Sequence, residues 1–308
     1  MTKLELPHLP YNSWKETRLT VHLMLQIIGK TRLGLTSRKN HWWYITIYVS
    51  PRGFSTFTIP VDQGTCSLEI EFNIHKRAVV ITHITKGSVQ IELQNGLSIA
   101  QFYKQFKAEL SKLGLSPKFV EKPYDMGIGK PFDQLNEYNT FNWDDIHKFW
   151  QLMQWNNSVF QEFSGRFYGK TCAVHIYWHH MDLAVTRFSG KKLEPMVKSA
   201  RISDRDAYSH EQISFGFWTG DDKVQEPAYY SYTFPSPNKI DEQPLSPSTA
   251  SWVDSNGSPM AFLSFEDVKS LPDPRQAVLD FLESAYQSGA NLAGWNVKEL
   301  TTPALKDI

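Results

Sequence analysis

The feature that most constrains the fold is an internal similarity between the two halves of the 308-residue chain. One segment opens with Ser98 and Gln101, and the other opens with Asp273 and Gln276. Each pair has the spacing of a helix N-cap followed by its third helical residue. Apolar residues then recur at helical spacing, and a glycine closes each segment at the same distance from the cap. The pattern predicts two matching amphipathic helices, each ending one half of the chain.

The beginnings of the two halves also correspond. A predicted helix over Trp14–Ile28 runs into a Gly-Lys-Thr sequence at Gly29, and one over Asp144–Tyr168 runs into a second at Gly169. Each is followed by an apolar stretch and then by a cluster of Trp and His. We interpret Gly29 and Gly169 as residues that end their helices. The alternative to an internal repeat is that the two halves share only the helix caps and strand ends common to α+β domains.

Short segments with strand character lie between these helices. They are rich in β-branched residues or alternate in polarity, and turn residues separate them. Strands joined by short turns pair antiparallel. The sequence therefore predicts the α+β class, with two pseudo-repeats that each run helix – antiparallel sheet – helix. The predicted strands are 44–49, 54–60, 67–74, 78–83 and 88–93 in the first half, and 172–186, 212–218, 228–234 and 260–265 in the second.

These elements divide the chain into a first repeat over residues 10–120, a linker over 121–142 and a second repeat over 143–300. Proline and glycine are frequent in the linker. Two polar segments, 191–207 and 235–251, are expected to be loop insertions in the second repeat, and the second of them is rich in Pro and Ser.

Charge and composition exclude several classes of protein. Lys and Arg together number 32 and so do Asp and Glu, so the net charge is zero and nucleic acid is not an expected partner. Two Cys cannot build a disulfide framework. The first residues lack the apolar region of a signal peptide, and no apolar run is long enough for a membrane span. We expect a cytoplasmic protein without a membrane partner, and its oligomeric state stays open.

The Gly-Lys-Thr sequences do not fit a nucleotide-binding loop. Such a loop has a further glycine upstream of the Gly-Lys pair and lies between a strand and a following helix. The required positions are Met24 and Ser164, and both Gly-Lys-Thr sequences follow a helix rather than precede one.

The richest chemistry lies between His175 and Asp182. If this stretch is a strand, His180 and Asp182 share one face, about 6.6 Å apart. With a third ligand from His210 or Glu211 they offer a mixed nitrogen and oxygen site for a divalent transition metal such as zinc, manganese or iron. The alternative is a half-buried strand whose histidines bond to their neighbours. A nucleophile has less support, because Ser209 and His210 are adjacent and would point to opposite faces of a strand.

Charged residues in the apolar strands indicate either an ion-pair network or a ligand cleft, because burying them unpaired is costly. For a cleft, Arg187 would clamp an anionic group. His210, Glu211 and Asp182 would supply acid–base chemistry if a reaction occurs. Aromatic residues near the same strands suit a pocket for a small organic ligand, although they are also typical of a core. The expected ligand-binding residues besides Arg187 are Trp178, Tyr208, Trp218, Trp42 and Trp43.

One run in the second half, Trp178-x-x-x-Asp182-Leu-Ala-Val-Thr-Arg187-Phe-Ser-Gly190, is followed by Tyr208-Ser-His-Glu211 and Phe217-Trp218. Together with His41-Trp42-Trp43, these motifs resemble a bacterial family described only as a domain of unknown function. The resemblance covers nearly the whole chain. It implies a bacterial cytoplasmic protein and assigns no activity and no catalytic residue. It marks Asp182, Arg187, Tyr208, His210, Glu211 and Trp218 as motif positions.

Three functions follow as hypotheses. The first is the binding of a small, anionic organic ligand in a pocket of the second repeat. The second is a metal-assisted hydrolase that uses His180, Asp182, His210 and Glu211. The third is an interaction protein whose two repeats imitate a symmetric dimer. The sequence does not decide whether the protein is an enzyme.

Overall fold

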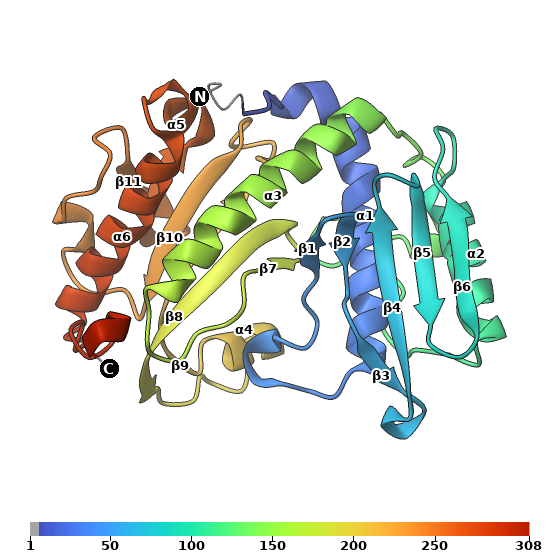
Figure 1. Ribbon diagram of the computed structural model, residues 1–308, viewed down its shortest axis with the longest axis horizontal. Helices are drawn as coiled ribbons and strands as arrows, with labels where there is room; N and C mark the ends of the chain where they lie inside the picture. Colours follow the sequence, from blue (N-terminus) through green and yellow to red (C-terminus); the bar gives the residue numbers. More distant parts are fainter. Residues whose placement is uncertain (1–5, 308) are drawn as a thin grey trace. The chain divides into compact units, whose positions relative to one another are not determined.

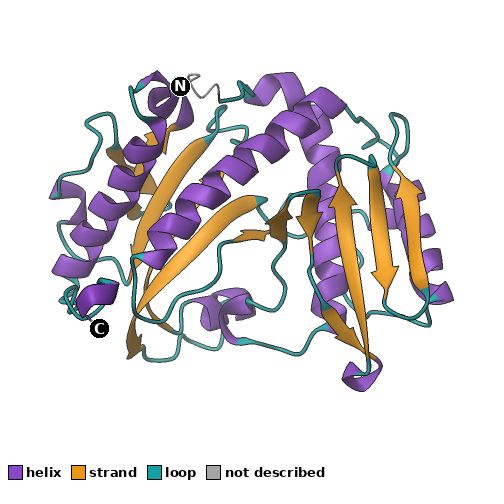
Figure 2. Cartoon of the chain, in the orientation of Figure 1, coloured by secondary structure: helices purple, strands orange, loops and turns teal. Residues whose placement is uncertain are grey.

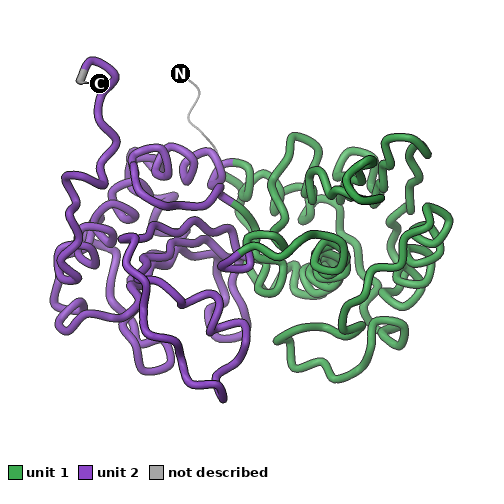
Figure 3. Tube along the Cα trace, turned by 90° about the horizontal axis from the view of Figure 1, so that it is seen from below, with its two compact units in different colours: residues 1–39, 43–154, 175–181 green, residues 40–42, 155–174, 182–308 purple. Residues whose placement is uncertain are grey.

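The computed structural model describes residues 6–307, which form helices and two antiparallel sheets (Figures 1 and 2). Contacts divide the chain into two compact units (Figure 3). Unit 1 holds residues 6–39, 43–154 and 175–181, and unit 2 holds residues 40–42, 155–174 and 182–307. The α+β class and the order helix – antiparallel sheet – helix in each half confirm the prediction.

Unit 1 is built around helix α1, in which every residue from 20 to 32 is buried. The sheet has the order β1-β2-β4-β5-β6, and β3 also pairs with β4. Helix α1 packs against α2 and β3, and α2 packs against β6. The elements are α1 Tyr11–Leu35, β1 Tyr48–Ser50, β2 Gly53–Ser55, β3 Ile59–Val61, the 3-10 helix η2 Asp62–Gly64, β4 Cys66–Asn73, β5 Ala78–His83, β6 Gly87–Glu92, α2 Ile99–Lys112, η3 Phe132–Gln134 and β7 His175–Tyr177.

In unit 2 the strands β8, β9, β10, β12 and β11 lie side by side in that order. Helix α6 packs on β9 and β10. Along β10 the alternate residues Tyr229, Ser231 and Thr233 are buried, and those between them are half-buried. The elements are η1 Asn40–Trp42, β8 Asp182–Lys192, α4 Ile202–Ala207, β9 His210–Trp218, β10 Ala228–Phe234, η4 Ile240–Glu242, β11 Ser251–Ser255, β12 Ser258–Ser264, α5 Phe265–Ser270, α6 Pro274–Leu292 and η5 Leu305–Asp307.

Helix α3, Trp143–Gly165, contributes its first half to unit 1 and its second half to unit 2. Phe149 packs on Phe54 in unit 1, with ring centroids 5.1 Å apart. Phe163 packs on Phe215 in unit 2, with ring centroids 4.7 Å apart. No helix among residues 6–307 is long and apolar enough to cross a membrane.

Both closing helices begin where the sequence predicts. The backbone N–H of Gln101 donates to the Ser98 hydroxyl, and the Gln101 side chain accepts from the Ser98 backbone, which completes a capping box. At α6 the backbone N–H of Gln276 donates to the Asp273 carboxylate at 3.0 Å. The similarity between the starts of α2 and α6 therefore reflects the same kind of N-cap hydrogen bond.

The interpretation of Gly29 and Gly169 as helix ends was wrong. Helix α1 continues through Gly29 to Leu35, and α3 ends at Gly165, before Gly169. A Cβ atom on Gly29 would lie only 2.0 Å from Cδ1 of Trp178. Gly29 is needed because the Trp178 indole packs directly on the backbone of α1.

The expected strand over residues 172–186 was also wrong as a single element. β7 ends at Tyr177, a turn follows, and β8 begins at Asp182. Met181 adopts a left-handed backbone with φ of 60° in this turn. The alternation of faces expected from His175 to Asp182 therefore does not exist. A further strand, β11, was not predicted.

Residues 121–142 lie within unit 1, and so do residues 143–154. Phe132 and Leu135 are fully buried. The Gln26 side chain of α1 bonds to both the N–H and the C=O of Tyr124. In the structure this segment is therefore packed on the helices of unit 1.

Candidate functional site

The candidate site is centred on Arg187, which lies in the apolar strand β8 and is 1% exposed. Its guanidinium carbon lies 3.6 Å from the ring centroid of Phe163 and 4.3 Å from that of Tyr286. Its Nη2 donates to the carbonyl of Phe163 at 2.6 Å. That carbonyl belongs to the last turn of α3, where a cation is favoured by the helix dipole. The aromatic rings and the helix end therefore hold the guanidinium in place.

The charge on Arg187 is partly compensated. Its Nη1 lies 3.7 Å from Oε2 of Glu283, a residue of α6. Burial lowers the pKa of Arg187 to about 10, while Glu283 and Tyr286 act to raise it. The guanidinium thus remains charged at neutral pH, although burial of that charge is unfavourable.

A hollow of about 450 Å³ lies beside this guanidinium within unit 2. Two short extended segments form part of its wall, because Phe167 bridges to Thr301 and the N–H of Thr302 donates to the carbonyl of Arg166. The hydroxyl of Thr302 donates to the carbonyl of Gly165. The lining residues are Gly165, Arg166, Arg187, Glu283, Tyr286, Thr301 and Thr302.

Cations exceed anions around the hollow. Arg166 and Arg275 both bind Glu162, at 2.7 and 2.8 Å, and Arg187 is opposed by Glu283. Three arginines therefore face two glutamates in this part of unit 2. One small anion would neutralise the remaining charge.

Two polar atoms in the wall residues lack a hydrogen-bond partner among the described residues. They are Nε of Arg187 and the hydroxyl oxygen of Tyr286, and both are buried. A buried unsatisfied polar atom costs about 1–3 kcal/mol. Burial raises the pKa of Tyr286, so its hydroxyl keeps the proton and can donate it.

Asp182 lies on the opposite face of the sheet from Arg187, because the two are an odd number of residues apart in β8. Trp218 and Tyr208 lie on the same face as Asp182. A row of aromatic side chains follows that face. Tyr230 donates to Oδ2 of Asp182 at 2.5 Å, and its ring lies 5.8 Å from that of Trp218. Burial, and then Asp182, raises the pKa of Tyr230 well above its usual value. The row continues through Tyr232, whose hydroxyl lies 3.3 Å from that of Tyr208.

Asp182 and His210 do not come together. The β8–β9 register pairs Leu183 with Phe217 at one end and Lys192 with His210 at the other. About eight residues of strand, or roughly 26 Å, therefore separate the two. The metal set of His180, Asp182 and His210 is not assembled within unit 2, because His180 belongs to unit 1, where its Nε2 lies 3.4 Å from Oδ2 of Asp125.

His210 and Glu211 do not form an acid–base pair. The Glu211 carboxylate accepts from Ser189 at 3.0 Å and from Lys191 at 2.8 Å. The His210 ring lies 5.3 Å from that of His41. Adjacent strand positions point to opposite faces, so the two functional groups diverge.

The environment of His210 contains a Ser–His contact that sequence reasoning dismissed. Ser209 precedes the strand, and its Oγ lies 3.1 Å from Nδ1 of His210. The same hydroxyl donates to the carbonyl of Asp206 at 3.0 Å. Because a serine has one hydroxyl proton, Oγ accepts from Nδ1 here, which is the reverse of the direction that activates a nucleophile.

His41 belongs to the same region of unit 2. Its Nδ1 lies 3.2 Å from the carbonyl of Ala207, and its Nε2 lies 2.7 Å from Nζ of Lys170. A carbonyl only accepts, so Nδ1 carries the proton and Nε2 accepts from the ammonium. Burial, followed by Lys170, lowers the pKa of His41 to about 4. Burial also lowers the pKa values of Lys170 and His210.

The three remaining tryptophans from the sequence prediction do not line the hollow. Trp178 packs on Gly29 in unit 1, and Nζ of Lys30 lies 5.4 Å from its ring. Trp43 of unit 1 has Nζ of Lys39 at 5.6 Å from its ring. In unit 2, the indole N–H of Trp42 donates to the carbonyl of Ser203 at 2.9 Å. Of the expected ligand-binding residues, Arg187 alone lines the hollow.

Sequence reasoning missed most of the wall. Arg166 lay inside the predicted helix over Asp144–Tyr168, whereas in the structure it directly follows the end of α3 at Gly165. Tyr286 belongs to the apolar stripe of α6, which looks like ordinary core. Thr301 and Thr302 carried no signal, because pairing distant in sequence brings them to Arg166.

A different group has metal-ligand chemistry. Asp62, Cys66 and His83 lie in unit 1, and their potential ligand atoms are close enough to share one ion. Among residues 6–307, they form the one such set of three His, Cys or carboxylate side chains.

The model of a family of unknown function, DUF5996, matches residues 6–302. No curated protein and no solved structure matches the chain.

Proposed function

Since the chain belongs to the DUF5996 family of unknown function, we propose its function from the geometry of the candidate site. Unit 2 binds a small anionic organic ligand in the hollow beside Arg187. The observation that carries this proposal is the excess of positive over negative side chains around the hollow. Arg166 and Arg187 both line it, and one local glutamate is shared between Arg166 and Arg275.

The aromatic surroundings favour an organic anion over a bare inorganic one. The guanidinium of Arg187 stacks on Phe163 and Tyr286, so its planar edge is held in a fixed direction. A fixed guanidinium suits a planar carboxylate, which accepts two parallel hydrogen bonds. The unpartnered hydroxyl of Tyr286 is a further donor. The ligand would therefore be bound by charge-assisted hydrogen bonds from a wall that is partly apolar.

The binding test uses a matched pair of probes, benzoate and its uncharged amide, benzamide, with inorganic phosphate as a third probe. Calorimetry and thermal denaturation at low salt measure binding and the stabilisation it causes. We expect benzoate to bind at least about tenfold more tightly than benzamide, since a charge-assisted contact contributes about 1.5–3 kcal/mol. Phosphate binding as tight as that of benzoate would contradict the preference for an organic anion.

The chain offers a matched pair of variants. Arg166→Gln and Arg275→Gln each remove one cation bound to Glu162, and the two side chains are almost equally exposed, at 41% and 40%. Only Arg166 lines the hollow. We expect Arg166→Gln to weaken benzoate binding about tenfold and Arg275→Gln to leave it nearly unchanged. Equal losses in both variants, or no anion binding by the wild type, would refute the proposal.

A further inference from the structure

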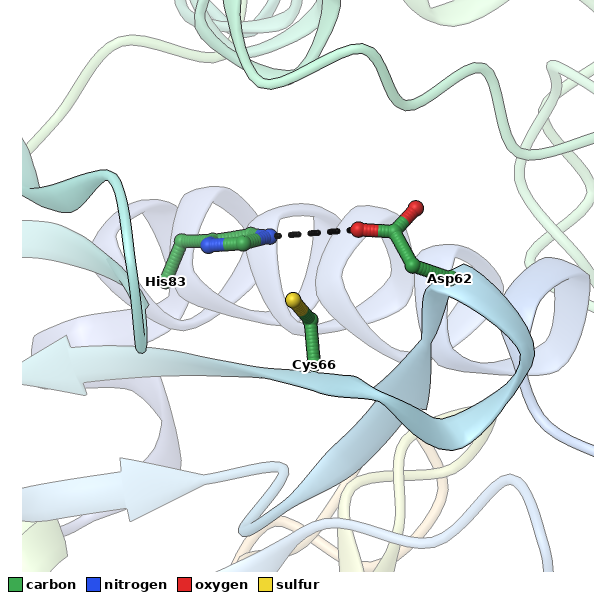
Figure 4. Close-up of side chains that lie close together, drawn as sticks. All are labelled: Asp62, Cys66 and His83. Carbon is green, nitrogen blue, oxygen red and sulfur yellow. Dashed lines mark ion pairs between the residues drawn. The ribbon is translucent and has the colours of Figure 1, made fainter.

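Three side chains with different ligand chemistry converge at one corner of the sheet of unit 1 (Figure 4). Asp62 begins η2, Cys66 begins β4 and His83 ends β5. One potential ligand atom from each residue lies within 4.8 Å of the other two. Figure 4 shows the thiol of Cys66 pointing toward the gap between the His83 ring and the Asp62 carboxylate.

Strand pairing brings these residues together. Cys66 is opposite Val61, the last residue of β3, so Asp62 follows directly in the connection between the two strands. His83 is opposite Leu68 in the β4–β5 pair, near the same end of β4. Asp62 and Gln63 in the connection have φ values of 50° and 58°. Non-glycine residues adopt this left-handed conformation infrequently, and such residues occur at ligand-binding turns.

The ring of His83 is buried and incompletely satisfied. The residue is 1% exposed, and its Nε2 has no hydrogen-bond partner among the described residues. Oδ2 of Asp62 is 3.9 Å from this nitrogen, too far for a hydrogen bond. A buried ring nitrogen without a partner is costly. A cation between Nε2, the carboxylate and the thiol would satisfy it once the ring proton moves to Nδ1.

The second ring nitrogen of His83 is held in place by Thr85. The backbone N–H of Thr85 donates to Nδ1 of His83 at 3.3 Å, and the Thr85 hydroxyl oxygen lies 3.2 Å from the same nitrogen. Metal binding at Nε2 therefore moves the ring proton to Nδ1, which then donates to the Thr85 hydroxyl oxygen in place of the hydrogen bond it accepts from the backbone N–H. Such outer contacts fix the orientation and tautomer of metal-bound histidines.

We propose that Asp62, Cys66 and His83 bind a divalent transition metal of the zinc class, with three protein ligands and a fourth position open to water. A thiolate with an imidazole selects zinc-class ions, whereas Mg²⁺ and Ca²⁺ prefer oxygen ligands. Ligand atoms at about 2.0–2.1 Å from a tetrahedral ion are roughly 3.3 Å apart. The 3.9 Å between His83 and Asp62 must therefore shorten by about 0.6 Å. Asp62 can supply this movement, because its side chain is 52% exposed.

The arrangement differs from that of a Cys-His-Asp hydrolase. There the thiol and the carboxylate are bonded to opposite nitrogens of the imidazole. In this chain the carboxylate faces Nε2, while Nδ1 is engaged by Thr85. Binding of the metal forms a bond from the Cys66 sulfur to the ion and releases the thiol proton to solvent.

The test is titration of the full-length, chelator-treated protein with Co²⁺, followed by optical absorption. A cysteine ligand to Co²⁺ gives a sulfur-to-metal charge-transfer band, and a tetrahedral site gives intense visible bands. We expect both bands to saturate at one ion per chain and to disappear when Zn²⁺ is added. Absence of the charge-transfer band in the folded wild-type protein would overturn the proposal.

The two cysteines of the chain provide a matched control. Cys66→Ser should abolish the charge-transfer band, and Cys172→Ser should retain it, because Cys172 lies in unit 2. Asp62→Asn changes a half-exposed side chain and should leave the fold intact while weakening Zn²⁺ binding by about tenfold or more. Equal bands in both cysteine variants, or unchanged Zn²⁺ affinity in Asp62→Asn, would show that these residues do not form the site.

Discussion

At the scale of single residues, the same residue type has different roles depending on what packs against it. Gly29 and Gly165 both lie in long helices, and both are followed closely by a charged residue. Gly29 faces the Trp178 indole, whereas nothing lies within 4 Å of a Cβ atom placed on Gly165. The difference is invisible in local sequence.

Substitution of these two glycines by alanine should therefore have opposite effects. Gly29→Ala places a Cβ atom 2.0 Å from the Trp178 ring and should destabilise the protein by about 1–3 kcal/mol or more. Gly165→Ala should be neutral or stabilising by up to about 1 kcal/mol, because alanine favours the helix. Denaturant unfolding measures both, and an unaffected Gly29→Ala protein would contradict the observed packing of Trp178.

At the scale of secondary-structure elements, the two closing helices are specified by their own sequences. Ser98 and Asp273 accept hydrogen bonds from the backbone at the third helical position of α2 and α6. The signal was readable because a cap involves residues only three positions apart. The ends of the strands were harder to predict from the sequence, because where a strand ends depends on the strand that pairs with it.

The caps can be tested together. Ser98→Ala and Asp273→Ala should each reduce the free energy of unfolding by about 1 kcal/mol, because each leaves a backbone N–H without its acceptor. Ser111→Ala, at an exposed position inside α2, serves as the control and should change stability by less than about 0.5 kcal/mol. A loss in the control as large as in the cap variants would show that capping is not the cause.

At the scale of the whole molecule, buried histidines connect the fold to pH. Nε2 of His22 donates to the carbonyls of Trp178 and His179, at 3.0 and 3.1 Å, so α1 holds the turn that follows β7. Burial, and then Arg18, lowers the pKa of His22 to about 3. The buried ring is therefore neutral in the folded protein at all but acid pH.

Acid should consequently unfold the protein through this group. Between the folded pKa of about 3 and the usual value of 6.5, the unfolded chain binds more protons than the folded chain. The contribution of His22 to the free energy of unfolding is complete above pH 6.5 and falls as the pH decreases, by up to about 1.4 kcal/mol per pH unit. His22→Gln should show a shallower decline in denaturant unfolding measured from pH 7.5 to 4. Above pH 7 the two curves should run parallel; equal slopes below pH 6 would refute the role of His22.

The candidate site shows what could not be predicted. Arg187 was identified because a charge inside an apolar strand needs a partner, which is a property of the local sequence. The residues around it come from the end of α3, from α6 and from residues 301–302. Their meeting depends on pairing between distant segments, as Thr302 with Arg166 shows. The expected cluster with Asp182 and His210 failed because the β8–β9 register, which no local signal sets, holds them at opposite ends.

The sequence alone determined the α+β class, the repeated order of helix, antiparallel sheet and helix, and the starts of α2 and α6. These follow from periodicity and capping, which act over a few residues. Tertiary structure decided that Gly29 is a packing position, that residues 178–181 form a turn, and that Asp62, Cys66 and His83 meet in unit 1. Strand register and side-chain packing join residues far apart in the chain, and their free energy depends on partners that local patterns do not name.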